Sequence, residues 1–261
     1  MPESADHTDH AAPGDDFRNP GTHQGNTLTR PTAWLLLPPA ILLAPLSGFL
    51  LYMVHRTGSN EPFHAWNLLW TAFDIGAEGN AAVWFASTVW LVVGVFAALA
   101  AVTAPRFRKS WWLFSAVGVM ASMDEAAALH ERLFVVGDRL APYLPFDTFY
   151  NWVIPGSIIA LVVAVLLIRL VLALDRRVTA ALIASAALFL LGSLVIETLT
   201  GFVHRADEGM STTYLVLMYI EETCELIAVA VAATALSSMF RVVRVPHGLT
   251  VRFDGFRSPT A

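Results

Sequence analysis

No charged residue interrupts the stretch AAVWFASTVWLVVGVFAALAAVTA at residues 81–104. It exceeds the about 20 apolar residues that an α-helix needs to cross the hydrocarbon core of a bilayer. Further apolar segments of similar length recur along the chain, which predicts an all-α, polytopic membrane helix bundle of about six transmembrane helices. The six segments are approximately Thr32–Val54, Ala81–Ala104, Trp111–Val136, Trp152–Leu174, Thr179–Val203 and Thr213–Phe240.

Composition supports a membrane protein and excludes several other classes. Hydrophobic residues make up 56% of the chain and charged residues 14%, against about 25% charged residues in soluble domains. Cys224 is the only cysteine, which excludes an internal disulfide, a CxxC redox pair and a cysteine-based zinc finger. Lys109, the only lysine, lies in an Arg-rich loop and so argues against a retinal Schiff base. No basic stripe indicates nucleic-acid binding.

The charges between the apolar segments predict the topology. Residues 1–30 are polar and lack signal-peptide features, so we expect a disordered cytoplasmic tail. Residues 31–240 then form the transmembrane domain, and residues 241–261 a cytoplasmic C-terminal tail. By the positive-inside rule, the Arg-rich loops face the cytoplasm of a bacterial inner (plasma) membrane and the acidic loops face outward. The inner set is Arg106, Arg108, Lys109, Arg176, Arg177, Arg241, Arg244, Arg252 and Arg257; the outer set is Glu61, Asp74, Glu78, Asp138, Asp147, Asp207 and Glu208.

Residues 62–79 form an amphipathic segment that is too polar to span. Polar residues recur at steps of three and four, with aromatic residues on the opposite side. This pattern predicts an interfacial helix on the outer surface. It is either an anchor or a lid over a site, and its candidate lid or entrance residues are His64, Asp74 and Glu78.

Ionisable residues inside the spans are the strongest functional signal. Each acid at a helix centre costs about 2.5–3.5 kcal/mol on insertion scales, so a bound cation, shared protons or water must offset the cluster. Spacings of three, four and seven residues put several of these groups on common helix faces. The predicted site residues are Asp124, Glu131, Glu197, His204, Glu222 and Glu225, followed by Glu221 and His130. Glu125 and His130 diverge by roughly 100° either way from the face of Asp124.

Depth along the helices places these groups in one layer. At about 1.5 Å per residue, Asp124 lies roughly 20 Å and Glu131 roughly 30 Å above the inner start of their helix. Glu197 lies roughly 27 Å above the start of the next inward-starting helix. Glu222 and Glu225 lie roughly 14–18 Å below the outer start of the last one. The site is therefore expected in the outer half of the membrane, facing outward.

Carboxylates and imidazoles on facing helices form the ligand set of di-iron and di-manganese bundles. The Glu-x-x-His motif usual in such bundles is missing, and a mixed oxygen and nitrogen set also suits zinc or manganese. Carboxylates outnumber histidines, so iron is the preferred divalent metal. The sequence predicts a metal-dependent oxidoreductase acting on a lipid or other small hydrophobic substrate at the outer leaflet. A zinc-dependent membrane hydrolase is an alternative.

Three further functions use the same residues. A cation- or proton-coupled transporter would use the carboxylates as a relay, although the inner halves of the helices hold few ionisable groups. A haem b protein would use His130 and His204 as axial ligands. A non-catalytic assembly factor would need the cluster only for stability. Acids near helix ends, such as Glu131 and Glu221, also have the simpler interpretation that they face interfacial water.

Two motifs carry a resemblance. Ser122-Met-Asp-Glu with His130-Glu131, and Glu221-Glu222-x-x-Glu225, together with Glu78-x-Asn80, resemble a group of uncharacterised multi-pass bacterial membrane proteins over most of residues 60–230. The resemblance supports the choice of residues and implies no activity. The Glu-Glu-x-x-x-Arg motif of Abi-type intramembrane proteases is broken by Leu226, and the His-x-x-x-His helix of alkaline ceramidase-like hydrolases is missing.

Overall fold

A computed structural model describes residues 26–58, 64–145, 149–207, 209–246 and 248–257. Most of the predicted N-terminal tail, residues 1–25, lies outside this part. Residues 62 and 63 of the predicted interfacial segment lie outside it too, as do Glu61, Asp147 and Glu208 of the predicted outer loops.

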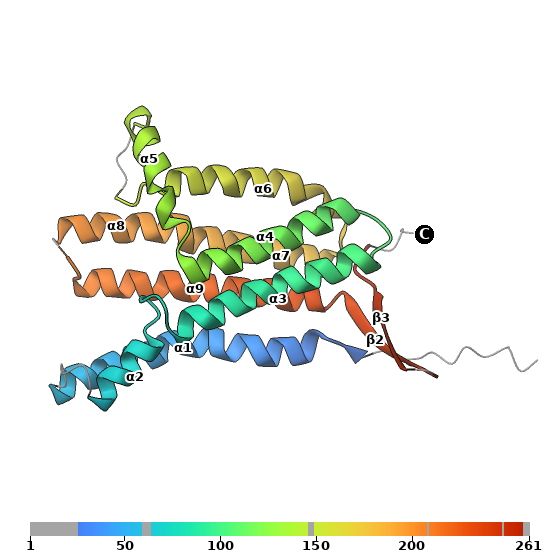
Figure 1. Ribbon diagram of the computed structural model, residues 1–261, viewed down its shortest axis with the longest axis horizontal. Helices are drawn as coiled ribbons and strands as arrows, with labels where there is room; N and C mark the ends of the chain where they lie inside the picture. Colours follow the sequence, from blue (N-terminus) through green and yellow to red (C-terminus); the bar gives the residue numbers. More distant parts are fainter. Residues whose placement is uncertain (1–25, 59–63, 146–148, 208, 247, 258–261) are drawn as a thin grey trace, which may run out of the picture.

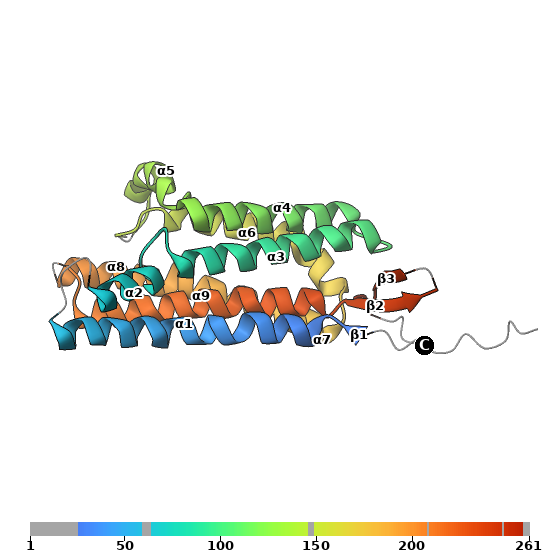
Figure 2. The same ribbon diagram turned by 60° about the horizontal axis from the view of Figure 1, so that its bottom comes forward.

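The described chain is mainly a bundle of long helices that run side by side (Figures 1 and 2). The helices are α1 (Thr29–Thr57), α2 (Ala65–Phe73), α3 (Ala81–Thr103), α4 (Arg108–Ala127), α5 (Phe134–Leu140), α6 (Val153–Ala173), α7 (Arg176–Leu190), α8 (Glu197–Ala206) and α9 (Thr212–Ser237). Two short 3₁₀ turns, η1 (Glu131–Leu133) and η2 (Ala141–Tyr143), flank α5, and a π-helical segment, η3 (Leu191–Ile196), joins α7 to α8.

Four described helical segments are long and apolar enough to cross a membrane, namely α1, α3, α6 and the continuous run α7–η3–α8. A fifth is added if α4 and the segment after it count as one span bent by 89°. The chain is therefore a polytopic helical membrane protein. Helix α9 has 26 residues, but Glu221, Glu222 and Glu225 interrupt its apolar character.

The predicted third span, Trp111–Val136, is broken. Helix α4 ends at Ala127, and Ala128 takes the left-handed conformation with φ of 44°. The carboxylate of Asp124 accepts a hydrogen bond from the backbone N–H of His130, over 2.5 Å. A side chain thus satisfies one backbone donor where the helical hydrogen bonds stop. The chain then turns away into η1 and α5 (Figure 1).

The C-terminal segment forms a small antiparallel sheet that an all-α prediction does not contain. Strand β2 (Phe240–Val245) pairs with β3 (Gly248–Phe253), and β1 (Asn26–Thr27) adds to the other edge of β2. Aromatic contacts hold the sheet to the bundle. The ring of Phe253 lies 6.0 Å from that of the fully buried Trp111 and 5.8 Å from that of Phe240. Short hairpins are only marginally stable on their own, so burial of these rings is needed to stabilise the two strands.

Helix α9 packs between α1 and α7. Its C-terminal half is rich in alanine and closely packed, with Leu226, Val229 and Leu236 buried. The N-terminal half carries the glutamates and has no buried residue. The two halves of one helix therefore lie in different surroundings, one an apolar core and the other a polar space.

Candidate functional site

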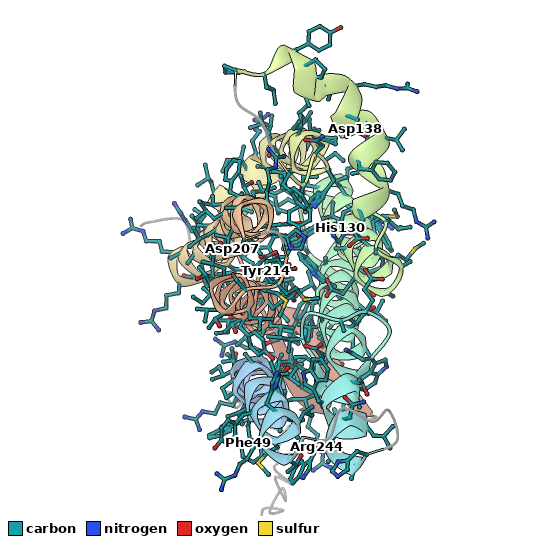
Figure 3. The ribbon with its side chains drawn as sticks, turned by 90° about the vertical axis from the view of Figure 1, so that its left-hand side faces the viewer. Phe49, His130, Asp138, Asp207, Tyr214 and Arg244 are labelled. Carbon is teal, nitrogen blue, oxygen red and sulfur yellow. The ribbon has the colours of Figure 1, made fainter. Side chains whose placement is uncertain are left out.

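A cavity of about 320 Å³ lies between α3, α4, α6, α7–α8 and the N-terminal half of α9. Among the residues that the structure describes, eight acidic side chains line it, and no lysine or arginine does. They are Glu78, Asp124, Glu125, Glu131, Glu197, Glu221, Glu222 and Glu225. His130 is the one imidazole in this described lining. Figure 3, viewed along the bundle, shows His130 and Tyr214 near its centre, between α4 on one side and α8 and α9 on the other.

The cavity is closed at one end by apolar side chains. The rings of Trp90 on α3 and Phe189 on α7 pack edge to face with centroids 5.2 Å apart. Leu190 and Leu226 complete this floor. At the other end, Glu78 and Glu131 are exposed. The carboxylates are therefore reached from the end of the bundle that carries α2 and α5, and the floor separates them from the end that carries the sheet (Figure 1).

Helix α9 supplies three of the carboxylates. Glu222 and Glu225 lie close enough to Glu125, Glu221 and Glu197 for their charges to interact. Gly192 permits this arrangement, because a Cβ atom there would lie 2.9 Å from Cγ of Glu225 and 3.1 Å from the carbonyl oxygen of Glu221. Gly192 belongs to the π-helical segment η3, a distortion often found at functional sites.

Asp124 and His130 form a pair across the break after α4. Oδ2 of Asp124 lies 3.0 Å from Nδ1 of His130, while Oδ1 accepts the His130 backbone N–H. This contact occupies Nδ1, which leaves Nε2 as the ring nitrogen available to a ligand. The ring of His130 also packs 4.6 Å from that of Trp152. Asp124, predicted as a direct ligand, lines the cavity and also orients the imidazole of His130.

Neighbouring donors hold two further carboxylates. Nε1 of Trp152 donates a hydrogen bond of 2.7 Å to Oε1 of Glu197. The hydroxyl of Thr200 lies 3.1 Å from Oε2 of Glu221. Glu197 therefore has one oxygen bound by the protein and a second open to a ligand. The single proton of the Thr200 hydroxyl is shared between Glu221 and the carbonyl oxygen of Ile196, which lies 2.9 Å away.

His204 lies outside the cavity lining. Its ring packs between Phe149, at 5.2 Å, and Tyr214, at 5.1 Å. Its Nδ1 atom is buried and has no hydrogen-bond partner within the described ranges. The seven-residue spacing places His204 about two turns from Glu197 and just beyond the cavity, where it joins an aromatic cluster with Phe149, Tyr150 and Tyr214.

The three candidate lid residues occupy different positions relative to the cavity. Glu78 lines the cavity. Asp74 is not part of the lining and lies beside Ser47 of α1, where burial raises the pKa of its carboxyl, although the Gly76 N–H and the Ser47 hydroxyl donate opposing hydrogen bonds. His64 caps the start of α2, where its Nδ1 atom accepts from the Trp66 N–H over 3.3 Å. The loop after α2, rather than α2 itself, therefore covers the cavity.

Sequence reasoning passed over several residues of the lining. Glu125 was set aside because an ideal helix turns it roughly 100° from Asp124, yet both face the cavity, which is wide enough to be lined by two sides of α4. Trp152, Tyr150 and Tyr214 carry no pattern that marks them. A hydrogen-bonding aromatic residue beside a predicted carboxylate helix is the only sequence signal they offer.

The acidic side chains surround the cavity and do not meet at a point. Within the described ranges, no three His, Cys, Asp or Glu side chains are grouped so that they could hold a metal ion as they stand. Their donor types suit a hard divalent cation. Binding such an ion would require glutamate side chains to rotate inward.

One family model matches residues 36–239, and it is described as a domain of unknown function, DUF8692. The match includes the whole cavity and agrees with the resemblance to an uncharacterised family drawn from its motifs. No curated protein and no solved structure matches the chain.

The packing of the glutamates predicts that the metal-free protein is destabilised by its own charges. In detergent with a chelator, Glu225→Gln should raise the free energy of unfolding by about 1–2 kcal/mol, the Coulomb energy of one repulsive pair about 8–16 Å apart at an effective dielectric constant of about 20. Asp207→Asn, a similar change at an exposed position, should leave it unchanged. Thermal unfolding measures both. An unchanged or lower stability of Glu225→Gln would contradict the arrangement.

Proposed function

The chain belongs to the DUF8692 family, and we propose that it is a membrane-embedded, metal-dependent enzyme of the di-iron carboxylate and histidine type. It would oxidise a lipid or other membrane-soluble substrate at the outer leaflet. One observation carries the proposal. Acidic side chains from α4, α8 and α9 and the imidazole of His130 face one cavity that is closed toward the sheet end of the bundle.

Electrostatics supports a bound cation. Carboxylates that share a low-dielectric site cannot all be ionised unless positive charge compensates them. The described lining supplies no lysine or arginine for this purpose. A divalent metal ion offsets two charges in a small volume and accepts carboxylate oxygens as ligands. Shared protons offset the same charges, and the metal content decides between them.

The donor set favours iron or manganese, with zinc as the alternative. Glu125, Glu197, Glu222 and Glu225 would supply oxygen ligands, and His130 would supply Nε2. The Asp124 carboxylate behind His130 is the usual partner of a ligating imidazole and fixes its orientation. Carboxylate-rich sites are typical of di-iron and di-manganese bundles, which carry two histidines where the described lining has one. The bound metal would supply the redox chemistry. The protein residues would hold it in place, and the apolar floor would exclude water from the sheet end of the bundle.

A cation- or proton-coupled transporter would use the same carboxylates but needs a path through the floor. Trp90, Phe189, Leu190 and Leu226 are apolar and packed together there. Transport would have to separate the Trp90 and Phe189 rings in every cycle. The packed floor therefore supports an enzyme that is open on one side.

We further propose six spans, with α9 and the bent α4 segment completing the set, in the plasma membrane with both termini cytoplasmic. The Arg-rich turns between α3 and α4 and between α6 and α7 lie at the same end of the bundle as the sheet (Figure 1). The acidic loops and α2 lie at the opposite end. This separation of charge supports an outward-facing site.

Cysteine reporters test the topology. In a Cys224→Ala background, Thr71→Cys on α2 and Thr250→Cys on β3 place single thiols at exposed positions at the two ends. A membrane-impermeant maleimide added to right-side-out vesicles should label the α2 reporter and should label the β3 reporter only after permeabilisation. Labelling of the two from the same side, or the reverse pattern, would overturn the proposed orientation.

Metal analysis tests the function. Protein purified in detergent from cells supplied with iron and manganese should retain about one to two equivalents of metal per chain. Glu222→Gln and Glu225→Gln should each lose most of it, because each removes a charged ligand, whereas Asp207→Asn should retain it. Elemental mass spectrometry gives the content and the identity of the metal. If wild-type protein holds no metal under these conditions, the metalloenzyme proposal fails.

A further inference from the structure

Helix α6 is packed most closely against the bundle near its two ends, and Val163 between them is only partly buried against the core. Val153 and Pro155 are buried at the outer end, and Leu167 and Leu170 at the inner end. None of the residues 156–166 between them is buried. A helix that is packed more loosely in its middle than at its ends leaves a seam beside its neighbour.

The cavity reaches this seam. Ala121 of α4 and Gly156 and Ala160 of α6 line it, and none of them has a side chain larger than a methyl group. Gly156 has a further role, because a Cβ atom there would lie 2.8 Å from the ring of Trp152, which donates to Glu197. The small residues at the seam thus connect the carboxylates with the space between α4 and α6.

The seam faces the apolar phase. Met120 and Met123 on α4 are 55% and 52% exposed, and Ile159 and Val162 on α6 are 52% and 50% exposed. In a bundle that spans a membrane, such side chains contact lipid tails. A molecule that enters here therefore comes sideways from the bilayer. Its polar head enters the cavity first, and its apolar chain follows from the lipid.

The cavity also selects the charge of what enters. It presents eight acidic side chains and one imidazole, with no lysine or arginine in its described lining. A phosphate or carboxylate head would meet repulsion and no cationic partner. An ammonium head meets carboxylates, together with the aromatic faces of Trp152, Tyr150 and Tyr214, which attract cations.

The size of the cavity limits the rest of the ligand. A volume of about 320 Å³ is at the lower end of the range for small-molecule sites. It holds a head group and the first part of one chain, and it excludes the two-chain body of a phospholipid. The remainder of the chain would lie in the seam and in the lipid beyond it.

We propose that the ligand is a single-chain amphiphile with an amine head, a long-chain alkylamine, that enters through the α4–α6 seam. The ammonium group binds at Glu221, a lining carboxylate outside the proposed metal ligands, and the alkyl chain passes between Ala121 and Ala160. This inference rests on the proposed function in one respect only, that the same cavity is the reaction site.

Photolabelling of the full-length protein in detergent tests the proposal. A hexadecylamine analogue with a diazirine in its chain should label residues of α4 or α6 saturably, and unlabelled hexadecylamine should compete. The matching hexadecanoic acid analogue should label about tenfold less. Equal labelling by the acid, or labelling that hexadecylamine does not reduce, would overturn the assignment of the amine.

Two seam variants test the route. Ala121→Phe should reduce labelling about tenfold by filling the seam, and Ala116→Phe, the same change on the exposed side of α4, should not. Ala160→Leu provides a second test should Ala121→Phe fail to fold. Labelling that neither folded variant reduces would refute entry through the seam.

Metal content measured on the same samples separates the two proposals. If the purified protein holds no metal and the seam variants still reduce labelling by the amine, the metalloenzyme proposal is refuted and the ligand proposal stands. If metal is bound and the seam variants do not reduce labelling, the metalloenzyme proposal stands and the proposed ligand with its route is refuted.

Discussion

Carboxylates held inside a membrane bundle repel one another and lose the solvation of water, and much of this structure accommodates that cost. The N-terminal half of α9, around Glu221, Glu222 and Glu225, contains no fully buried residue, whereas its C-terminal half is tightly packed through alanine. Trp152 and Thr200 contact single carboxylate oxygens. The cavity gives the remaining oxygens a space in which water, protons or a cation can reach them.

The site depends on departures from regular helix. The break at Ala128 turns the chain so that His130 reaches the carboxylate of Asp124, which an unbroken helix would point elsewhere. The π-helical segment before Glu197 includes Gly192, whose missing side chain admits Glu225. Such distortions weaken backbone hydrogen bonding and persist only where other contacts compensate. Here Asp124 supplies that compensation for the broken helix.

Periodicity and hydropathy predicted the helical membrane bundle, because a long apolar run has few other solutions. They also marked the acids of α9, since an acid within such a run is rare. The geometry of the site was harder to predict. Ideal-helix geometry placed His204 on the same face as Glu197, but His204 lies just beyond the cavity lining. The same geometry separated His130 and Glu125 from Asp124. The C-terminal sheet escaped prediction because Phe240 and Phe253 fold only against a buried partner, Trp111.

The account depends on one claim, that acidic side chains from separate helices act together on one cation in a cavity open to the outer leaflet. Crystals of the protein grown with Mn²⁺ test it most directly through anomalous scattering. The account predicts an anomalous peak inside the cavity, in contact with glutamates of α9 and with Nε2 of His130. A structure with the carboxylates in place and the manganese bound elsewhere, or not bound at saturating concentration, would contradict it.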